Sequence, residues 1–93
     1  MGKEKFKDRS IDPDTKILSE KYFVHEGYDV LAEEWFWDGI KANSLVFLDE
    51  QVSNLADDEI VALGREIGQT TPAESVTFKR GKKFTYFNYN FRA

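Results

Sequence analysis

The sequence predicts a small α+β domain in which an antiparallel sheet of about four strands is packed by one or two helices. Three observations lead to this prediction. Asp38-Gly39 and Gly81-Lys82 each lie between two apolar segments, as turn residues do in β-hairpins. Residues 57–67 repeat apolar side chains at the spacing of a helix. The 8 Phe, 4 Tyr and 2 Trp among the 93 residues can fill the core of a single domain, which we place at residues 11–93.

The N-terminal part of the chain is predicted to hold a tail and then a helix. Residues 1–10 are polar apart from Phe6, and we expect them to form a flexible tail. Asp12-Pro13-Asp14 is typical of a helix start, because Asp can cap the first turn and Pro fits the first helical position. The ILSEKYFV segment that follows partly fits a helix and partly fits a strand. We expect a short helix that ends before Gly27.

A hairpin around Asp38-Gly39 would sort the neighbouring side chains onto two faces of the sheet, since residues alternate along a strand. One face then carries a mostly apolar set, which we expect to be core: Leu31, Trp35, Trp37, Ile40, Ala42 and Val46. The other face carries a mixed set: Glu34, Phe36, Lys41 and Asn43. In a rival interpretation residues 29–37 form a helix. We prefer the hairpin, because tryptophan and phenylalanine favour strands.

The middle of the chain predicts a strand and then a helix. Residues 44–50 fit a strand in either interpretation of the preceding segment. Residues 57–67 fit a helix that Gly68 ends and that buries one stripe of side chains: Ile60, Leu63 and Ile67. Gly64 and Gly68 have GxxxG spacing, which carries little meaning in a helix outside a membrane.

The C-terminal part predicts a second hairpin. After a loop at residues 69–74, strands at 75–80 and 83–92 are joined by a two-residue turn at Gly81-Lys82. That turn pairs Phe78 with Thr85. It directs one set of side chains into the core: Val76, Phe78, Phe87, Tyr89 and Phe91.

Several chemistries lack the residues that they need. Without cysteine the chain can form neither a disulfide nor a thiolate metal site. His25 is the single histidine and is expected to be a solvated side chain in a turn. The sequence contains no nucleophile elbow and no phosphate-binding loop, and its acidic clusters do not match an EF-hand. We therefore expect a protein that is not an enzyme and has no cofactor or metal site. With neither a signal peptide nor an apolar span, it is expected to be cytoplasmic.

The charge of the chain is unevenly distributed. Residues 1–9 carry a net charge of +2, residues 10–68 carry −10, and residues 69–93 carry +4, for a total of −4. An acidic middle between basic ends can present one acidic and one basic surface, or can fold so that the two neutralise each other.

The acidic middle suggests the first functional hypothesis. Trp35, Phe36 and Trp37 cannot all face inward on a strand, so Phe36 is either exposed or covered by an N-terminal helix. Exposed beside Glu34 and Asp38, it would help to bind a basic protein partner. We expect a non-enzymatic interaction protein, such as an inhibitor, an immunity or anti-defence factor, or a regulator.

The C-terminal hairpin suggests the alternative, a nucleic-acid-binding module. Its cations could contact phosphates: Lys79, Arg80, Lys82 and Lys83. Its outer face could hold unstacked bases on a platform: Phe84, Tyr86, Asn88 and Arg92. The net negative charge of the chain argues against this alternative. An open edge at the last strand could also pair with a second copy and form a homodimer. An enzyme or small-ligand binder built on the acidic residues ranks third.

Overall fold

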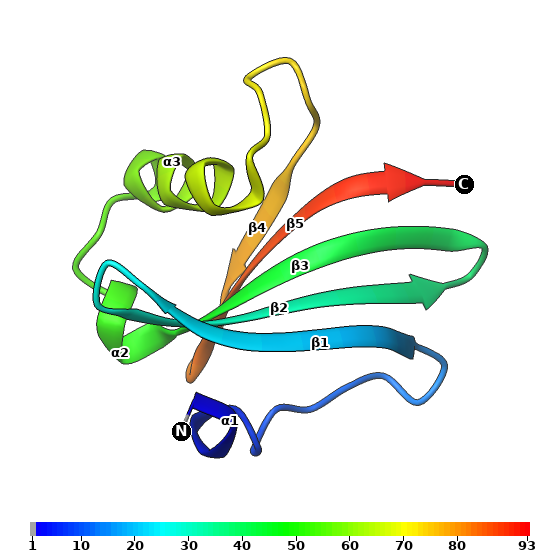
Figure 1. Cartoon of the computed structure of the whole chain (residues 1–93), viewed down its shortest axis with the longest axis horizontal. Coiled ribbons are helices and arrows are strands. Elements are labelled where there is room, and N and C mark those ends of the chain that lie inside the picture. Colours follow the sequence, from blue (N-terminus) through cyan, green and yellow to red (C-terminus); the bar gives the residue numbers. More distant parts are fainter. Residues whose placement is uncertain (1) are drawn as a thin grey trace.

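The computed structural model describes residues 2–93 as an antiparallel five-stranded sheet with helices on both sides (Figure 1). The strand order is β1-β2-β3-β5-β4. The elements in chain order are α1 (Gly2–Lys5), β1 (Lys16–His25), β2 (Tyr28–Trp37), β3 (Ile40–Leu48), α2 (Asp49–Val52), α3 (Asp57–Gly68), β4 (Thr77–Arg80) and β5 (Phe84–Arg92). The predicted α+β class is confirmed, with one strand more than the expected four. Among residues 2–93, no helix has the length and apolar content needed to cross a membrane.

The additional strand is β1, which replaces the helix predicted after Asp12-Pro13-Asp14. These residues form a turn instead, in which the backbone N–H of Thr15 donates to the carbonyl oxygen of Asp12 at 2.9 Å. The Asp12 carboxylate accepts a further bond from the backbone N–H of Asp14 at 2.9 Å. The helix prediction is wrong because Asp and Pro suit the start of a turn as well as the start of a helix. The segment that follows then pairs along β2.

The predicted hairpin at Asp38-Gly39 is confirmed, and the rival helix at residues 29–37 is wrong. Asp38 and Gly39 have φ values of 48° and 79°, as the two central residues of a type I′ turn require. The register pairs Trp37 with Ile40, as predicted. A second turn of this kind joins β1 to β2 at Glu26-Gly27, where φ is 48° and 86°.

One face of the sheet, which we call the helix face, packs against α3. Its core consists of Val30, Leu45, Phe47, Phe87 and Tyr89 together with Ile60 of the helix and Val52 of α2. The predicted helix and its buried stripe are confirmed, since Ile60 is fully buried and Leu63 and Ile67 pack on the same cluster. Gly64 lies so close to the sheet that a Cβ atom there would be 2.5 Å from the Phe87 ring.

The opposite face, which we call the strap face, is covered by residues 3–15, the N-terminal strap. Phe6 is only 3 % exposed and packs on the strap face with Leu31, Val46, Leu48 and Phe84. A flexible tail was expected at residues 1–10, whereas the segment around Phe6 is docked on the sheet. Met1 lies outside the described residues. The physical reason is Phe6 itself, because one aromatic ring that finds an apolar surface can fix a short polar segment.

The C-terminal hairpin forms, but its predicted register is displaced by two residues. Phe78 pairs with Phe87 rather than Thr85, so the turn is at Lys82-Lys83. Gly81 belongs to the strand end, where its N–H donates to the carbonyl oxygen of Phe84 at 2.8 Å. A Cβ atom on Gly81 would lie 2.8 Å from that same oxygen, so glycine is needed for close approach rather than for the turn. A shift of two residues leaves each side chain on its predicted face.

A bulge near the end of β5 changes which side chains share a face. Tyr89 pairs with Asn43, whereas Arg92 pairs with Lys41, and Asn90 between them has a φ of 57°. The bulge inserts one residue and reverses the alternation beyond it. Phe91, predicted to be core, is therefore 41 % exposed. The strand β5 is also internal, because it lies between β3 and β4. The expectation that the last strand leaves an open edge is therefore wrong for most of its length.

Candidate functional site

A cleft of about 300 Å³ lies between the N-terminal strap and the strap face of the sheet. The strap supplies one wall, and residues of β1, β2, β3 and β5 supply the floor. The cleft is lined by Arg9, Ser10, Ile11, Asp12, Thr15, Ile17, Glu33, Trp35, Trp37, Ser44, Tyr86 and Asn88. Aromatic and aliphatic side chains beside a few fixed polar groups are typical of ligand-binding and partner-binding clefts.

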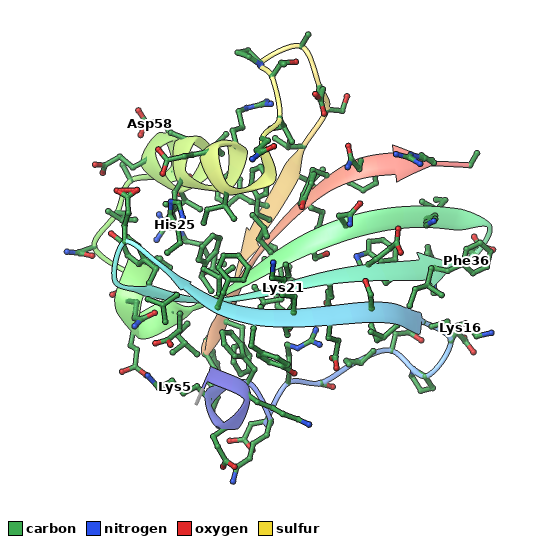
Figure 2. The ribbon with its side chains drawn as sticks, in the orientation of Figure 1. Lys5, Lys16, Lys21, His25, Phe36 and Asp58 are labelled. Carbon is green, nitrogen blue, oxygen red and sulfur yellow. The ribbon has the colours of Figure 1, made fainter. Side chains whose placement is uncertain are left out.

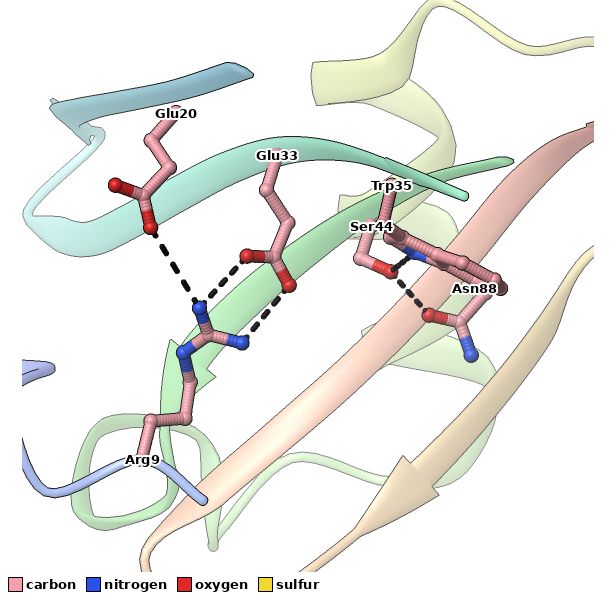
Figure 3. A network of polar contacts seen from close by, with 6 residues as sticks. All are labelled: Arg9, Glu20, Glu33, Trp35, Ser44 and Asn88. Carbon is pink, nitrogen blue, oxygen red and sulfur yellow. Dashed lines mark hydrogen bonds and ion pairs between the residues drawn. The ribbon is translucent and has the colours of Figure 1, made fainter. Parts of the chain in front are cut away.

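At one end of the cleft, a buried ion pair fastens the strap to β2 (Figure 3). The Arg9 guanidinium donates to both carboxylate oxygens of Glu33, at 2.8 and 2.7 Å, and lies 3.8 Å from Glu20. The side chains of Arg9 and Glu33 are 6 % and 4 % exposed. Burial raises the pKa of Glu33, while the charge of Arg9 acts in the opposite direction. Burial acts to lower the pKa of Arg9, but the charge and hydrogen bonding of Glu33, together with Tyr86, raise it overall.

In the middle of the cleft, a chain of hydrogen bonds fixes Trp35 (Figure 3). The Trp35 Nε1 donates to the Ser44 hydroxyl at 2.6 Å, and this hydroxyl donates to the Asn88 amide oxygen at 2.5 Å. The Asn88 Nδ2 donates in turn to the Thr77 hydroxyl at 3.2 Å. These polar groups are occupied by one another, so the indole ring presents an apolar surface of fixed orientation to the cleft.

The far end of the sheet carries an exposed apolar set beside this cleft. Of the large hydrophobic residues in the described chain that are exposed, all but Val24 belong to the strand ends and the loop there: Ile11, Leu18, Phe36, Trp37 and Phe91. We call these five residues the apolar end. Trp37 was expected to be core, but it is 39 % exposed because the buried part of the strap face ends before the last rung of the hairpin.

The three residues predicted to bind a basic protein partner lie at this end but in different surroundings. Phe36 is 43 % exposed on the helix face, which the N-terminal strap does not cover. Glu34 shares that face and forms an ion pair with Lys41 at 3.2 Å, so its charge is balanced locally. Asp38 is exposed in the hairpin turn.

The residues predicted to bind nucleic acid are distributed over both faces of the sheet. Tyr86 and Asn88 line the cleft, and Lys79 shares their face through its pairing with Tyr86. Phe84 is 9 % exposed and lies under Phe6, with ring centroids 6.0 Å apart, so the ring is covered.

The predicted cations are equally dispersed. Arg80 bonds to Asp57 at 3.1 Å on the helix face, and the bulge at Asn90 places Arg92 on that face too. Lys82 and Lys83 remain exposed at the hairpin tip. Only part of the predicted platform is therefore brought together.

The two basic ends of the chain meet at the opposite pole of the molecule, where α1 lies beside the β4–β5 turn (Figure 1). Lys5, Lys82 and Lys83 line one shallow surface there together with three acidic residues, Asp8, Asp49 and Glu50. Lys5 bonds to Asp29 at 2.9 Å, and Lys83 is 3.8 Å from Asp8. This pole is consequently a surface of mixed charge.

His25 links the β1–β2 turn to α3. Its Nε2 lies 2.7 Å from a carboxylate oxygen of Glu66 and 3.1 Å from one of Glu26. The hydrogen bond to Glu66 raises the pKa of His25 and lowers that of Glu66. The three side chains place one ligand atom each within 4.8 Å of one another, but both carboxylates are exposed and already bonded to the imidazole. The contacts are those of a surface ion pair that fastens the turn to the helix.

Comparison of the chain with protein-family models, with curated proteins and with solved structures finds no match. The cleft was also not predicted from the sequence, because Arg9 belongs to the segment expected to be a tail and Ile17 to the segment expected to be a helix. The signal for it was one aromatic residue, Phe6, among polar neighbours.

Proposed function

We propose that the protein is a non-enzymatic interaction protein whose protein partner contacts the apolar end and the adjoining cleft. The observation that carries this proposal is the gathering of exposed large apolar side chains at one end of the sheet. Isolated exposed apolar residues are normal, whereas several of them at one end of a sheet beside a cleft are typical of a binding surface. Trp37 joins the two features, since it is exposed and also lines the cleft.

The chemistry of the cleft supports binding more than catalysis. Its charged pair, Arg9 and Glu33, is engaged internally, and its indole N–H and hydroxyl groups bond to one another. Groups occupied in this way hold a surface in shape, whereas a general base or nucleophile must be free to reach a substrate. Tryptophan and tyrosine are also the usual anchors of protein interfaces.

The proposed contact residues differ from those chosen by charge in the sequence. Phe36 and Trp37 now carry the proposal, on opposite faces of the same strand end. Glu34 is engaged with Lys41, and a basic partner therefore gains little from it.

The test is capture of a partner from the extract of the source cells, followed by measurement of affinity with three matched variants. Phe36→Ser and Trp37→Ser each remove one ring from the apolar end. Val24→Ser is the control, and it removes a smaller apolar group, 65 % exposed, from the other end of β1. An interface anchor is typically worth about 2 kcal/mol, which is roughly thirtyfold in Kd.

We expect Trp37→Ser to weaken the partner by at least about tenfold and Val24→Ser to leave it unchanged. Equal binding by all three variants would contradict the proposal, as would the absence of any partner at both low and high salt. Sedimentation of the free protein tests whether β1, a long open edge strand, forms a homodimer. The bulge between Ile17 and Ser19 and the charges of Glu20 and Lys21 act against edge pairing.

Nucleic acid remains the alternative partner, supported by the exposed lysines of the β4–β5 turn and opposed by the burial of Phe84. A gel shift with short single strands at low salt tests it. Loss of a shift in the double variant Lys82→Glu, Lys83→Glu would support this alternative.

A further inference from the structure

At the end of the sheet near the Asp38-Gly39 turn, paired residues place three cations and one aromatic ring in a single row across four strands. Lys16 of β1 pairs with Phe36 of β2, Phe36 pairs with Lys41 of β3, and Lys41 pairs with Arg92 of β5. Directly paired residues of antiparallel strands point to the same face, so all four side chains lie on the helix face. Figure 2 shows Lys16 and Phe36 together at this end, far from Asp58 at the start of α3. We call these four residues the cationic row.

The cationic row is open to a partner. Phe36 is 43 % exposed and belongs to neither core cluster. Lys16 and Arg92 are exposed, and neither forms an ion pair with another residue in the part of the chain that the structure describes. Lys41 is the one member with an acidic neighbour, Glu34. The three cations of the row and Glu34 together carry a net charge of +2, although the chain as a whole carries −4.

We propose that the cationic row binds an acidic segment of the protein partner, one with an apolar side chain between its carboxylates. Charge complementarity determines the sign of the partner, and Phe36 supplies an apolar contact at the centre. Strands lie about 4.8 Å apart, so the row spans roughly 14 Å from Lys16 to Arg92. An extended peptide advances about 3.3 Å per residue, and carboxylates four positions apart therefore reach both ends. The matching pattern is acid-x-apolar-x-acid, laid across the strands.

This inference rests on the proposed function and reverses the charge expected of the partner from the sequence. It favours a peptide over single-stranded nucleic acid for two reasons. Nucleic-acid platforms stack successive bases on several rings, whereas the row has one ring. A strand with a phosphate at every nucleotide also needs a basic footprint larger than three cations on a chain of net charge −4.

The probe is a dodecapeptide that carries Glu-Ser-Phe-Ser-Glu between Gly-Ser flanks, added to the ¹⁵N-labelled protein and followed by amide chemical shifts. We expect shifts at the cationic row and its neighbours, with a Kd near 1 mM or tighter, in the range of weak surface contacts. Raising the salt from about 50 mM to about 500 mM should weaken binding by at least about fivefold, because exposed charges are screened.

Two double variants with the same change in net charge separate the row from general electrostatics. Lys16→Glu with Arg92→Glu should weaken the peptide by about tenfold or more, since like charges then face each other. Lys82→Glu with Lys83→Glu, at the opposite pole, should leave it unchanged. Equal melting temperatures show that both variants fold.

Several outcomes overturn the inference: shifts confined to the hairpin tip, equal affinity for a peptide with Lys in place of Glu, tighter binding of an oligo-dT strand of the same length, or self-association through the row. The proposed function is tested separately by Trp37→Ser. If that variant loses the captured partner while reversal of Lys16 and Arg92 does not, the proposed function stands and the acidic segment is refuted.

Discussion

Replacing Arg9 by Met tests whether the N-terminal strap is fixed to the sheet. Met keeps much of the side-chain volume but removes both hydrogen bonds to Glu33, at 2.8 and 2.7 Å. The Glu33 carboxylate, 4 % exposed, is then buried without its partner. Removal of one member of a buried ion pair destabilises a protein by about 3–5 kcal/mol. We expect a loss near the lower limit, about 3 kcal/mol, because Glu33 can take up a proton.

The loss of stability in Arg9→Met depends on pH through the Glu33 carboxyl group. Burial already raises the pKa of Glu33 in the folded protein, and without Arg9 it rises further. A carboxyl group whose pKa is higher in the folded than in the unfolded state binds its proton preferentially when folded, so stability increases as the pH falls. The destabilisation of Arg9→Met should therefore be smaller at about pH 5 than at about pH 7. The double variant Arg9→Met, Glu33→Leu should recover most of the loss, because apolar pairs often replace buried ion pairs without penalty.

Urea unfolding followed by tryptophan fluorescence measures these differences, since Trp35 and Trp37 line the cleft that the strap closes. The control is Lys7→Met, which removes one charge from the same segment at a side chain that is 70 % exposed. We expect the control to change stability by less than about 0.5 kcal/mol. A loss below about 1 kcal/mol for Arg9→Met, equal at both pH values, would refute the buried pair and with it the docked strap.

Three variants probe the helix face and its contact with the β1–β2 turn. Gly64→Ala should lower the stability measured by urea unfolding by about 1–2 kcal/mol. The new Cβ atom would lie 2.5 Å from the Phe87 ring, and this clash outweighs the gain of about 1 kcal/mol in helix propensity. A stabilised variant would contradict the close approach of α3 to the sheet. Thr85→Val should stabilise by about 1 kcal/mol, since the Thr85 hydroxyl is buried without a hydrogen-bond partner among the described residues, and an unchanged or lower melting temperature would count against this. Glu66 raises the pKa of His25. The pair therefore contributes stability that is complete below the pKa of His25 in the unfolded chain and is lost as the pH rises through its pKa in the folded protein. His25→Gln should remove this pH dependence, which urea unfolding at about pH 5.5 and about pH 9 would show.

The elements that the sequence predicted correctly are those whose local chemistry permits one outcome. Asp38-Gly39 adopts positive φ at both positions, and the hairpin register of β2 and β3 follows from that turn. The helix at α3 combines an acidic first turn with a regular apolar stripe. In both cases turn or helix chemistry agrees with the apolar pattern, so no distant contact is needed to decide the structure.

The errors arise where one residue type serves two purposes. Asp12-Pro13-Asp14 suits a turn and a helix start alike, and only the pairing of β1 with β2 decides between them. Gly81 was assigned to a turn because glycine tolerates positive φ, whereas it is needed for its close approach to Phe84. The bulge at Asn90 has no signal in the alternation of apolar residues, so the faces of Phe91 and Arg92 could not be predicted.

The candidate site was predicted only in part, because it depends on contacts between distant segments. Phe36 is exposed, which was one of the two alternatives, but its neighbour Trp37, expected to be buried, is exposed too. The cleft was not predicted, since it exists only when Phe6 and Arg9 dock on strands far along the chain. GxxxG spacing also meant more than expected, because Gly64 and Gly68 let α3 approach Phe87 and Tyr89.

The stacking of Phe6 on Phe84 joins opposite ends of the sequence and so orders the assembly of the protein. During synthesis Phe6 emerges among the first residues, whereas Phe84 is translated only after α3 and β4. Until then Leu31 and Val46, which pack with Phe6 and Phe84 in the folded protein, lack part of their apolar cover. The strap face is thus complete only when β5 is present, and a chain interrupted before β5 lacks Tyr86 and Asn88 in the floor of the cleft.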